Sequence, residues 1–437
     1  MTIKEDLVKK IYDKTAVVAV VGLGYVGLPL AVEKAKAGYK TIGFDIQQTK
    51  IEMVNKGVNY IGDILENELT DLVNRGLLKA TSDYSFIKEV DCVAICVPTP
   101  LDEHYQPDIS YVVNSTREIS KYLHKGMLVV LESTTYPGTT EDVVKPILEE
   151  TGLICGRDFF LAFSPERVDP GNKEFKTKNT PKVIGGITND CTEVAADLYR
   201  NILEGEVYEV SNPAVAEMEK ILENTYRNIN IALANEMAIL CDKMGINVWE
   251  VIDAAKTKPY GFAAFYPGPG IGGHCIPIDP FYLTWKAREY DYHTKLIETA
   301  GEINIYMPRF VVERSIRILN NQGIPLKGAK ILLLGVAYKQ DIDDYRESPV
   351  LKVIENLEKL GATVKYNDPY IPEFRYKDKE YKSVELTDAV LKESDLVVIT
   401  TMHSCYNYDF IHVNSKRIFD TKNATKNLAD RKNIELL

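Results

Sequence analysis

The sequence predicts an α/β protein with two doubly wound parallel-sheet domains joined by a central helical domain that contains one long helix. Three observations predict it. Short apolar runs alternate with helical stretches in the first 205 residues, an unbroken helical pattern covers residues 213–245, and strand-helix-strand order returns from residue 329. A chain of 437 residues also exceeds what one core usually serves. We expect domains at residues 1–205, 206–310 and 311–437.

The first domain opens with a strand, a helix and a second strand. Residues 16–24 (AVVAVVGLG) have the continuous apolar character of a buried strand, residues 25–38 predict a helix that ends at glycine, and residues 39–45 (YKTIGFD) predict the next strand. This order is the beginning of a parallel sheet.

The turn after the first strand carries the pattern GxGxxG. In a strand-turn-helix context, the first glycine makes the turn, the second lets the backbone approach a pyrophosphate, and the third lets the helix pack on the strand. An acid at the end of the next strand can bind a ribose 2′-hydroxyl and disfavours a 2′-phosphate, which indicates NAD rather than NADP. The glycines would otherwise serve only a tight turn. The predicted cofactor-binding residues here are Gly22, Gly24, Tyr25, Val26, Gly27 and Asp45.

Three further strands follow, each with polar or small residues at its end. They are predicted within residues 91–100 (DCVAICVPTP), 126–134 (GMLVVLEST) and 159–166 (FFLAFSPE). Ligands of such sheets bind at the carboxyl ends of the strands. Position alone therefore places three residues near the cofactor: Thr99, Thr134 and Glu166.

Residues 213–245 predict one long helix, because no proline follows the first turn. At 1.5 Å per residue such a helix spans more than one small domain and suits a spine between two domains or two subunits. Lys220 and Asn224 are four positions apart and share a face of it. They could stabilise a developing oxyanion together, although the spacing by itself favours a solvated surface pair.

A second α/β unit begins at residues 329–339 (AKILLLGVAYK) and continues with strands predicted in residues 362–370 and 394–404. Asp368 occupies the place that Asp45 has in the first domain, but the glycine pattern is missing. We interpret this as a weak internal repeat. Both α/β domains are thus expected to be Rossmann-like.

Residues 265–283 (FYPGPGIGGHCIPIDPFYL) crowd glycines around one cysteine, Cys275. Few packing needs explain such a cluster, whereas flexible glycines let main-chain N–H groups close around a ligand. A lone cysteine is usually a small core residue, and the seven cysteines form neither a disulfide framework nor a zinc site. The glycine loop makes Cys275 a candidate nucleophile. The adjacent His274 is expected to be mostly structural.

The charge excludes some partners. With 52 basic and 63 acidic residues the net charge is −11, which repels nucleic acid and anionic membranes. The sequence MTIKEDLVKK has no apolar signal segment, and the longest apolar runs are the size of strands. We expect a cytoplasmic protein with no nucleic acid, membrane or metal partner. Local backbone N–H groups can nevertheless bind a small anionic ligand, despite the negative net charge.

These motifs, taken together, resemble the nucleotide-sugar 6-dehydrogenase family, which includes UDP-glucose dehydrogenase. The resemblance covers essentially the whole chain and rests on VVGLGYVGLPLA, CVPTP, ESTTYPGT, FSPERVDPG, KILENTYRNINIALANE, GGHCIPIDPFYL and GVAYKQDIDDYRESP, in the family's order and spacing. The segments GPGIGGHCIPIDPFYL and SPERVDPG are most similar to the UDP-N-acetylglucosamine 6-dehydrogenase branch.

The resemblance implies an NAD-dependent, four-electron oxidation of the C6 hydroxyl of a UDP-sugar to a carboxylate. The acyl group would pass through a thiohemiacetal and a thioester on Cys275. The implied catalytic residues are Cys275, Lys220, Asn224, Asp279 and Glu166; Thr99, Thr134 and Arg346 would contact NAD; and Lys220, Asn224, Gly272, Gly273 and Lys339 would bind the UDP-sugar. The family also builds homodimers or higher homo-oligomers over the long helix.

Several alternatives stay open at this point. The substrate could be UDP-N-acetylglucosamine, UDP-N-acetylmannosamine, UDP-N-acetylgalactosamine or UDP-glucose. A catalytically silent nucleotide-sugar sensor would not need the Cys275 set. A 6-phosphogluconate-type or hydroxyacid dehydrogenase would need neither GGHC nor a second α/β domain.

The sequence departs from UDP-glucose dehydrogenases at two places. Pro170, beside Asp169, replaces a second acid four positions after Glu166, and Pro259, between Lys258 and Tyr260, replaces an arginine that the partner subunit donates. Sugar-binding details therefore cannot be transferred. A changed contact at the sugar's edge is consistent with an N-acetyl group on the substrate.

Overall fold

The computed structural model describes residues 2–62, 64–102, 106–168, 172, 174–273 and 275–437. The predicted residues Asp169, Pro170 and His274 lie outside these ranges. The chain divides into two compact units, each with its own sheet. Unit 1 comprises Met1–Glu223 and Phe281–Tyr292, and unit 2 comprises Asn224–Pro280 and His293–Leu437.

Unit 1 is built on an eight-stranded sheet in the order β3-β2-β1-β4-β5-β6-β7-β8. Its strands are β1 (Val17–Val21), β2 (Lys40–Phe44), β3 (Leu78–Thr81), β4 (Cys92–Ile95), β5 (Leu128–Leu131), β6 (Phe160–Phe163), β7 (Lys182–Gly186) and β8 (Val207–Val210). Neighbouring strands are parallel except β6 and β7, which run antiparallel. The strand order reverses between β1 and β4, which makes the sheet doubly wound, as the sequence predicts, and puts its ligand-binding crevice at the ends of these strands.

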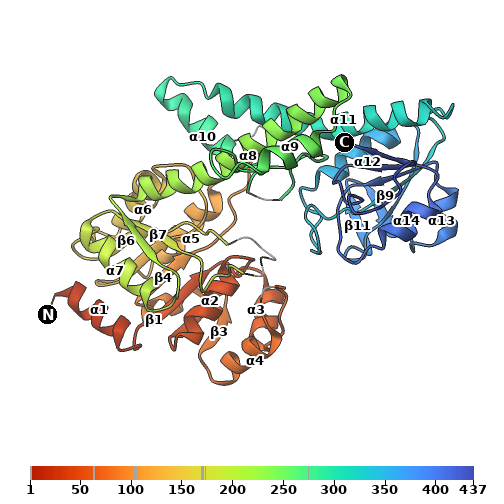
Figure 1. Ribbon diagram of the computed structural model, residues 1–437. Coiled ribbons are helices and arrows are strands. Elements are labelled where there is room, and N and C mark those ends of the chain that lie inside the picture. The colour runs from red at the N-terminus through yellow and green to blue at the C-terminus, as the bar shows by residue number, and fades with distance from the viewer. Residues whose placement is uncertain (1, 63, 103–105, 169–171, 173, 274) are drawn as a thin grey trace. The chain divides into compact units, whose positions relative to one another are not determined.

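The helices of unit 1 keep both faces of this sheet from solvent. They are α1 (Ile3–Tyr12), α2 (Gly27–Lys36), α3 (Gln48–Asn55), α4 (Glu66–Asn74), α5 (Ser110–Ser120), α6 (Lys145–Glu149) and α7 (Asn189–Arg200). Every residue of β4, β5 and β6 is buried, which is typical of parallel strands covered on both sides. The N-terminal helix α1 packs beside α7 (Figure 1).

Unit 2 contains a second parallel sheet, in the order β10-β9-β13-β14-β15, and a separate two-stranded antiparallel ribbon. The strands are β9 (Lys330–Leu334), β10 (Thr363–Asn367), β11 (Glu373–Tyr376), β12 (Lys379–Lys382), β13 (Leu396–Ile399), β14 (Ile418–Asp420) and β15 (Ile434–Leu436). Its helices are α9 (Val248–Lys256), α11 (Lys295–Asn320), α12 (Pro349–Lys359), α13 (Asp388–Glu393) and α14 (Tyr408–Asn414).

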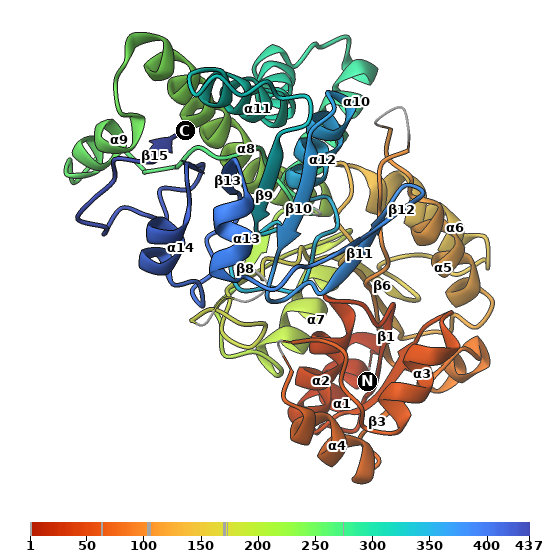
Figure 2. The same ribbon diagram turned by 90° about the vertical axis from the view of Figure 1, so that its right-hand side faces the viewer.

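Alternate side chains of β9 give the second sheet two cores. Ile331 and Leu333 pack with residues of α11 and α12, whereas Leu332 and Leu334 pack with residues of α13 and α14. Figure 2 shows this sheet with α12 and α13 labelled beside it. The unit is therefore doubly wound, and the prediction of two Rossmann-like sheets is confirmed.

Two helices contribute residues to both units: α8 (Pro213–Met244) and α10 (Asp279–Ala287). The first is the long helix predicted at residues 213–245. The expected domain boundary after residue 205 lies just before β8, and the one after residue 310 lies within α11. The three-domain division stays a proposal. None of the described helices has both the length and the apolar character that crossing a membrane requires.

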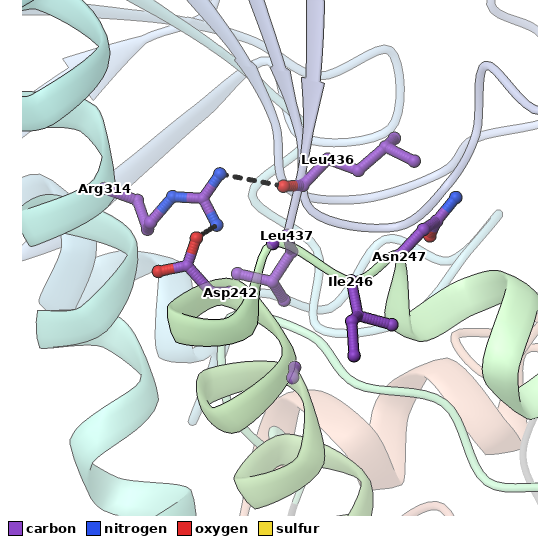
Figure 3. Close-up of a pocket in the computed structure, with 8 residues that line it drawn as sticks. Asp242, Ile246, Asn247, Arg314, Leu436 and Leu437 are labelled. Carbon is purple, nitrogen blue, oxygen red and sulfur yellow. Dashed lines mark hydrogen bonds and ion pairs between the residues drawn. The ribbon is translucent and has the colours of Figure 1, made fainter.

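A cavity of about 260 Å³ lies in unit 2 between the end of α8, the start of α9, α11 and the last two residues (Figure 3). Within it, Arg314 forms an ion pair with Asp242 at 2.6 Å and donates to the carbonyl oxygen of Leu436 at 3.0 Å. No predicted site residue lines this cavity. The residues around this cavity connect helices to the end of the chain. The candidate site lies elsewhere.

Candidate active site

The glycine loop of unit 1 has the geometry that its pattern predicts. Gly22 adopts φ +94°, and a Cβ there would lie 2.6 Å from the carbonyl oxygen of Cys96. A Cβ on Gly27 would collide with the carbonyl oxygen of Gly22, so helix α2 approaches the loop as closely as it can. At Gly24, by contrast, nothing lies within 4 Å of the Cβ position. This open space over a helix N-terminus fits the pyrophosphate of a dinucleotide.

Asp45 follows β2 and holds this loop in place. Its carboxylate accepts hydrogen bonds from the backbone N–H groups of Leu23, at 2.9 Å, and Gln47, at 2.8 Å. The Lys50 ammonium lies 3.8 Å away, and the Asp45 residue is only 8% exposed. An acid fixed at this point beside the loop is the feature that favours a ribose 2′-hydroxyl over a 2′-phosphate.

The ends of β4 and β5 bring two other predicted residues together. Thr99 donates a hydrogen bond from Oγ1 to the carbonyl oxygen of Thr134 at 2.7 Å. Tyr282, on the α10 segment of unit 1, donates from its hydroxyl to the carbonyl oxygen of Thr99. The sequence interpretation did not include Tyr282, because nothing in its spacing links it to the first sheet.

Glu166 lies just beyond β6, and three groups of unit 1 surround its carboxylate. Oε1 accepts from the backbone N–H groups of Arg167 and Val168, both at 2.8 Å. Oε2 lies 3.8 Å from the ammonium of Lys182, the first residue of β7. Lys182 in turn forms a 2.6 Å ion pair with Glu132 at the end of β5. Sequence reasoning missed Lys182 and Glu132, although a charged residue at either end of an apolar strand was the available signal.

Acidic residues in the first part of α8 bind loop and helix residues of unit 1. Glu217 accepts from the backbone N–H of Gly138 at 2.6 Å and from the N–H and hydroxyl of Thr140 at 2.8 and 2.7 Å. Glu223 pairs with Arg167, the neighbour of Glu166, at 2.5 Å. Lys220 lies between these anchors and is 8% exposed. It is not the solvated surface residue that helical spacing alone would favour.

The nucleophile loop belongs to unit 2 and is fixed to the other part of α8. Asn224 donates from Nδ2 to the Asp279 carboxylate at 2.5 Å, and Asn228 donates to the carbonyl oxygen of Ile276 at 3.0 Å. The Asp279 N–H donates to the carbonyl oxygen of Cys275 at 2.8 Å. Asp279 is 3% exposed. The structure thus brings together three predicted residues, Cys275, Asn224 and Asp279, by way of one short turn.

Cys275 differs in its exposure from the five buried cysteines. Five of the seven cysteines are buried, as expected for small core residues, whereas Cys275 and Cys405 are exposed. Burial raises the pKa of the Cys92 thiol to about 12. A thiol in that environment cannot act as a nucleophile at neutral pH, so exposure on a fixed turn sets Cys275 apart from the core cysteines.

The glycines before Cys275 have a packing role that the sequence interpretation did not foresee. A Cβ on Gly272 would lie 2.5 Å from Tyr338 Cβ and 2.9 Å from Pro349, and one on Gly273 would lie 3.0 Å from the Tyr338 ring. Gly270 and Gly273 also adopt positive φ angles of +129° and +92°. The statement that few packing needs explain these glycines was wrong, because the loop lies directly against residues that follow β9.

The segment after β9 carries the two other predicted residues of unit 2. Arg346 binds Asp344 in a bidentate ion pair, with distances of 2.9 and 2.7 Å, and its side chain is half exposed. Lys339 lies in the same segment. The backbone N–H of Tyr338 donates to the carbonyl oxygen of Asp344 at 3.1 Å, so the segment forms a closed loop. Lys339 thus lies next to the tyrosine against which the Cys275 loop packs.

Asp368 holds the loop after β9 in the second sheet, as Asp45 holds the loop after β1 in the first. Its Oδ2 accepts from the N–H groups of Val336 and Ala337 at 2.7 and 2.9 Å. His403 Nε2 lies 3.1 Å from the same oxygen. Burial acts to raise the pKa of Asp368, but the hydrogen bonds from His403 and the two N–H groups outweigh it and hold the pKa below its usual value. The proposed internal repeat therefore extends to the contacts of this acid.

Unit 1 thus holds a dinucleotide cradle with polar strand ends beside it, and unit 2 holds an exposed thiol on a turn anchored by an amide and a carboxylate. These features define an NAD-dependent dehydrogenase with a candidate covalent nucleophile. The chain matches the three domain models of the UDP-glucose/GDP-mannose dehydrogenase family: the NAD binding domain over residues 16–203, the central domain over 214–306 and the UDP binding domain over 332–427.

Known proteins similar to the chain support this assignment. UDP-N-acetyl-D-glucosamine 6-dehydrogenase of Pseudomonas aeruginosa is 40% identical over 81% of this chain and 83% of its own length. UDP-N-acetyl-D-mannosamine dehydrogenase of Campylobacter jejuni is 37% identical over 92% and 98%. The solved structure of UDP-D-ManNAc dehydrogenase from Pyrococcus horikoshii superimposes with a TM-score of 0.88 at 36% identity, covering 96% of this chain and 98% of that one.

The chain belongs to the UDP-glucose/GDP-mannose dehydrogenase family. It is an NAD-dependent UDP-sugar dehydrogenase with a UDP-binding domain near its C-terminal end. The relatives divide between N-acetylglucosamine and N-acetylmannosamine enzymes, so family membership alone leaves the sugar open.

Proposed function

We propose that the protein oxidises C6 of UDP-N-acetylglucosamine to the carboxylate, giving UDP-N-acetylglucosaminuronate, with Cys275 as the covalent nucleophile. The observation that carries the covalent part is the turn from Cys275 to Asp279. It presents an exposed thiol and is anchored by the 2.5 Å hydrogen bond from Asn224. Such a turn keeps a nucleophile in one orientation towards a bound substrate.

Bound NAD supplies the chemistry of hydride acceptance, once for each two-electron oxidation, so that two NAD molecules are reduced per sugar. The chain's own residues do the rest. After the alcohol has become an aldehyde, the Cys275 thiolate adds to C6 and forms a thiohemiacetal, which keeps a transferable hydrogen on an sp³ carbon. The second oxidation leaves a thioester. Water then cleaves the C6–S bond, releasing the carboxylate and the free thiol.

The other residues have roles that follow from the charges of the intermediates. Lys220 and the Asn224 amide stabilise the oxygen anions that form on C6, and this effect is largest where water is excluded. Asp279 orients Asn224 through their hydrogen bond, and Glu166 activates the water that cleaves the thioester. Thr99, Thr134 and Arg346 contact the dinucleotide, and Gly272, Gly273 and Lys339 bind the UDP-sugar.

Two observations support an N-acetylated sugar, and the first of them favours N-acetylglucosamine. The segments GPGIGGHCIPIDPFYL and SPERVDPG are most similar to that branch, and a relative of that name is 40% identical over 81% of the chain. Residues 258–260, where UDP-glucose dehydrogenases have an arginine, are exposed, and the Lys258 ammonium lies 5.2 Å from the centre of the Tyr260 ring. A site without that arginine suits a sugar with a different substituent.

The substrate is tested by measuring kcat/KM for four UDP-sugars in parallel through NADH release. We expect UDP-N-acetylglucosamine to exceed UDP-glucose and the N-acetylmannosamine and N-acetylgalactosamine epimers by about 10-fold or more, because a buried polar group left unpaired by the wrong sugar costs roughly 1–3 kcal/mol. A higher value for another sugar would replace the proposed substrate. Absence of NADH with all four would favour a nucleotide-sugar sensor instead, and NADH from an unlinked hydroxyacid would favour another dehydrogenase class.

We also propose that the protein forms a homodimer, or a higher oligomer built from it, through α8. One face of this helix carries seven exposed apolar side chains at steps of three, four or seven residues. They are Val215, Met218, Leu222, Tyr226, Leu233, Leu240 and Met244. At 3.6 residues per turn these positions form a single stripe, and a continuous apolar stripe of this length marks an interaction surface.

The dimer is tested with Leu233→Glu, which places a charge in the middle of the stripe on a residue that is 54% exposed. We expect light scattering to show the mass of one chain for this variant and at least twice that for the unmodified protein. Val413→Glu is the matched control, because Val413 is an apolar residue of α14 that is 78% exposed. A single-chain mass for the unmodified protein would refute the dimer.

A further inference from the structure

Four ionisable side chains that the proposed reaction does not use lie buried close to one another in unit 1. They come from α2, the end of β5, the start of β7 and α7, and they are Lys34, Glu132, Lys182 and Tyr199, with exposures of 0, 1, 5 and 0%.

Three of these side chains, Tyr199, Glu132 and Lys182, form a chain of contacts that ends on Glu166. The Tyr199 hydroxyl donates to one oxygen of Glu132, and the Lys182 ammonium lies 2.6 Å from the other. The same ammonium lies 3.8 Å from Glu166 Oε2, while Glu166 Oε1 accepts two backbone hydrogen bonds. Both oxygens of Glu166 thus face a positive charge or N–H donors of unit 1, although its side chain is still 13% exposed.

Stability does not explain a buried pair of this kind. Removing two charges from water costs several kcal/mol per ion, and apolar residues of similar size are often as stabilising. Here the charge is kept on Lys182: burial acts to lower its pKa, but Glu132 and Glu166 together raise the pKa above its usual value. Burial lowers the pKa of Lys34, whose Nζ has no hydrogen-bond partner among the described residues. Lys182 is therefore the cation that Glu166 faces.

Two further ionisable groups near Glu166, among the residues that the structure describes, do not compete for this role. Cys96, after β4, stays a thiol, because burial and the charge of Glu132 raise its pKa well above the usual value. Arg167, the next residue, turns to Glu219 and Glu223 on α8, at 3.5 and 2.5 Å.

We propose that Lys182 and Glu132 are positioning residues for the hydrolytic half of the reaction. Glu132, fixed by Tyr199, holds the Lys182 ammonium beside Glu166. The ammonium in turn faces Oε2 of Glu166 and fixes its direction, while the two backbone N–H groups hold Oε1. A carboxylate fixed in this way can accept a proton from the water that cleaves the thioester. This role rests on the proposed function, because it requires that Glu166 act on the thioester.

The test is the hydrolysis step in the double variant Lys182→Met/Glu132→Gln, which removes the ion pair without leaving an unpaired buried charge. Without the ammonium that directs Glu166 Oε2, the thioester should be cleaved more slowly, so kcat should fall by about 10-fold or more and an acyl adduct should accumulate on Cys275 during turnover. The KM values for NAD and UDP-sugar should change less than twofold. Glu132→Gln alone should act in the same direction, because the ammonium loses the carboxylate that holds it beside Glu166. Lys182→Arg keeps a cation at this position, and its kcat should stay within threefold of the unmodified value.

A matched control is Lys178→Met, because Lys178 forms an exposed ion pair with Glu204 at 2.6 Å in the same region of the chain. Its kcat should not change. A double variant with an unchanged kcat and no acyl adduct, or a Glu132→Gln variant with neither effect, would overturn the positioning role. If the double variant does not fold, Glu132→Gln and Lys182→Arg still decide the matter. The proposed reaction fails separately, if the unmodified protein forms fewer than two NADH per sugar or if Glu166→Gln accumulates no acyl adduct on Cys275.

Discussion

Replacing Cys275 with serine is expected to lower steady-state NADH production by about 10³-fold or more, in line with the loss of nucleophiles in other covalent enzymes. A serine hydroxyl is a far weaker nucleophile than a thiolate, and any ester it formed would be cleaved more slowly than a thioester. The measurement is the steady-state rate of NADH formation with saturating NAD and UDP-N-acetylglucosamine. Acid formation, followed by chromatography of the sugar nucleotide, should fall by the same factor.

The control for this prediction is Cys405→Ser, because Cys405 is the other exposed cysteine of the chain. It lies after β13 and outside the turn from Cys275 to Asp279, and its removal should leave the rate within twofold. If Cys275→Ser produced NADH at the unmodified steady-state rate, the covalent mechanism would be refuted.

Replacing Lys220 with methionine is expected to lower kcat by about 10²–10³-fold, the usual loss on removing one donor from an oxyanion site. Lys220 is 8% exposed and lies between the anchors that Glu217 and Glu223 provide for α8. Methionine keeps most of its volume, so the effect should come from the lost charge rather than from lost packing. KM for the UDP-sugar should rise much less than kcat falls, because the anion develops mainly in the transition state.

The matched control is Lys243→Met, which makes the same substitution at an exposed position near the end of the same helix. Circular dichroism and a thermal melt should show that both variants keep the fold. A kcat for Lys220→Met within threefold of the unmodified value would remove Lys220 from the oxyanion site and return it to a structural role.

The parts of the fold that sequence patterns predicted best are those governed by local rules. The first strand, the glycine turn and Asp45 form one continuous segment, and β1, α2 and β2 occur where their periodicity places them. The long helix α8 was predicted to within one residue, because its pattern has no internal glycine or proline. Its acidic anchors and its link to Asp279 could not be predicted, since they depend on residues 55 to 79 positions away.

Helix α11 shows where local rules fail. Pro308 lies inside it and is buried, although a proline inside a helix lacks an N–H donor and normally ends or bends the helix. The helix nevertheless runs from Lys295 to Asn320, and its side chains, including Met307 and Phe310, pack into one core of the second sheet. Tertiary packing here outweighs the local cost of the proline, and a domain boundary at residue 310 therefore falls in the middle of an element.

Local sequence rules also predicted part of the candidate site. Thr99, Thr134 and Glu166 follow from the rule that strand ends carry the chemistry, and Cys275 follows from its glycine loop. Lys182 and Glu132 were missed, because their ion pair joins residues 50 positions apart across neighbouring parts of the sheet. The packing of Gly272 against Tyr338 was missed too, since it depends on how the turn lies against the second sheet.

The measurement that tests the covalent four-electron oxidation most directly is the amount of NADH formed from a limiting, known quantity of UDP-N-acetylglucosamine with excess NAD. The proposed mechanism predicts two NADH per sugar, a product with a C6 carboxylate, and no free aldehyde trapped by added hydrazine. One NADH per sugar, with a trapped C6 aldehyde as the product, would contradict it.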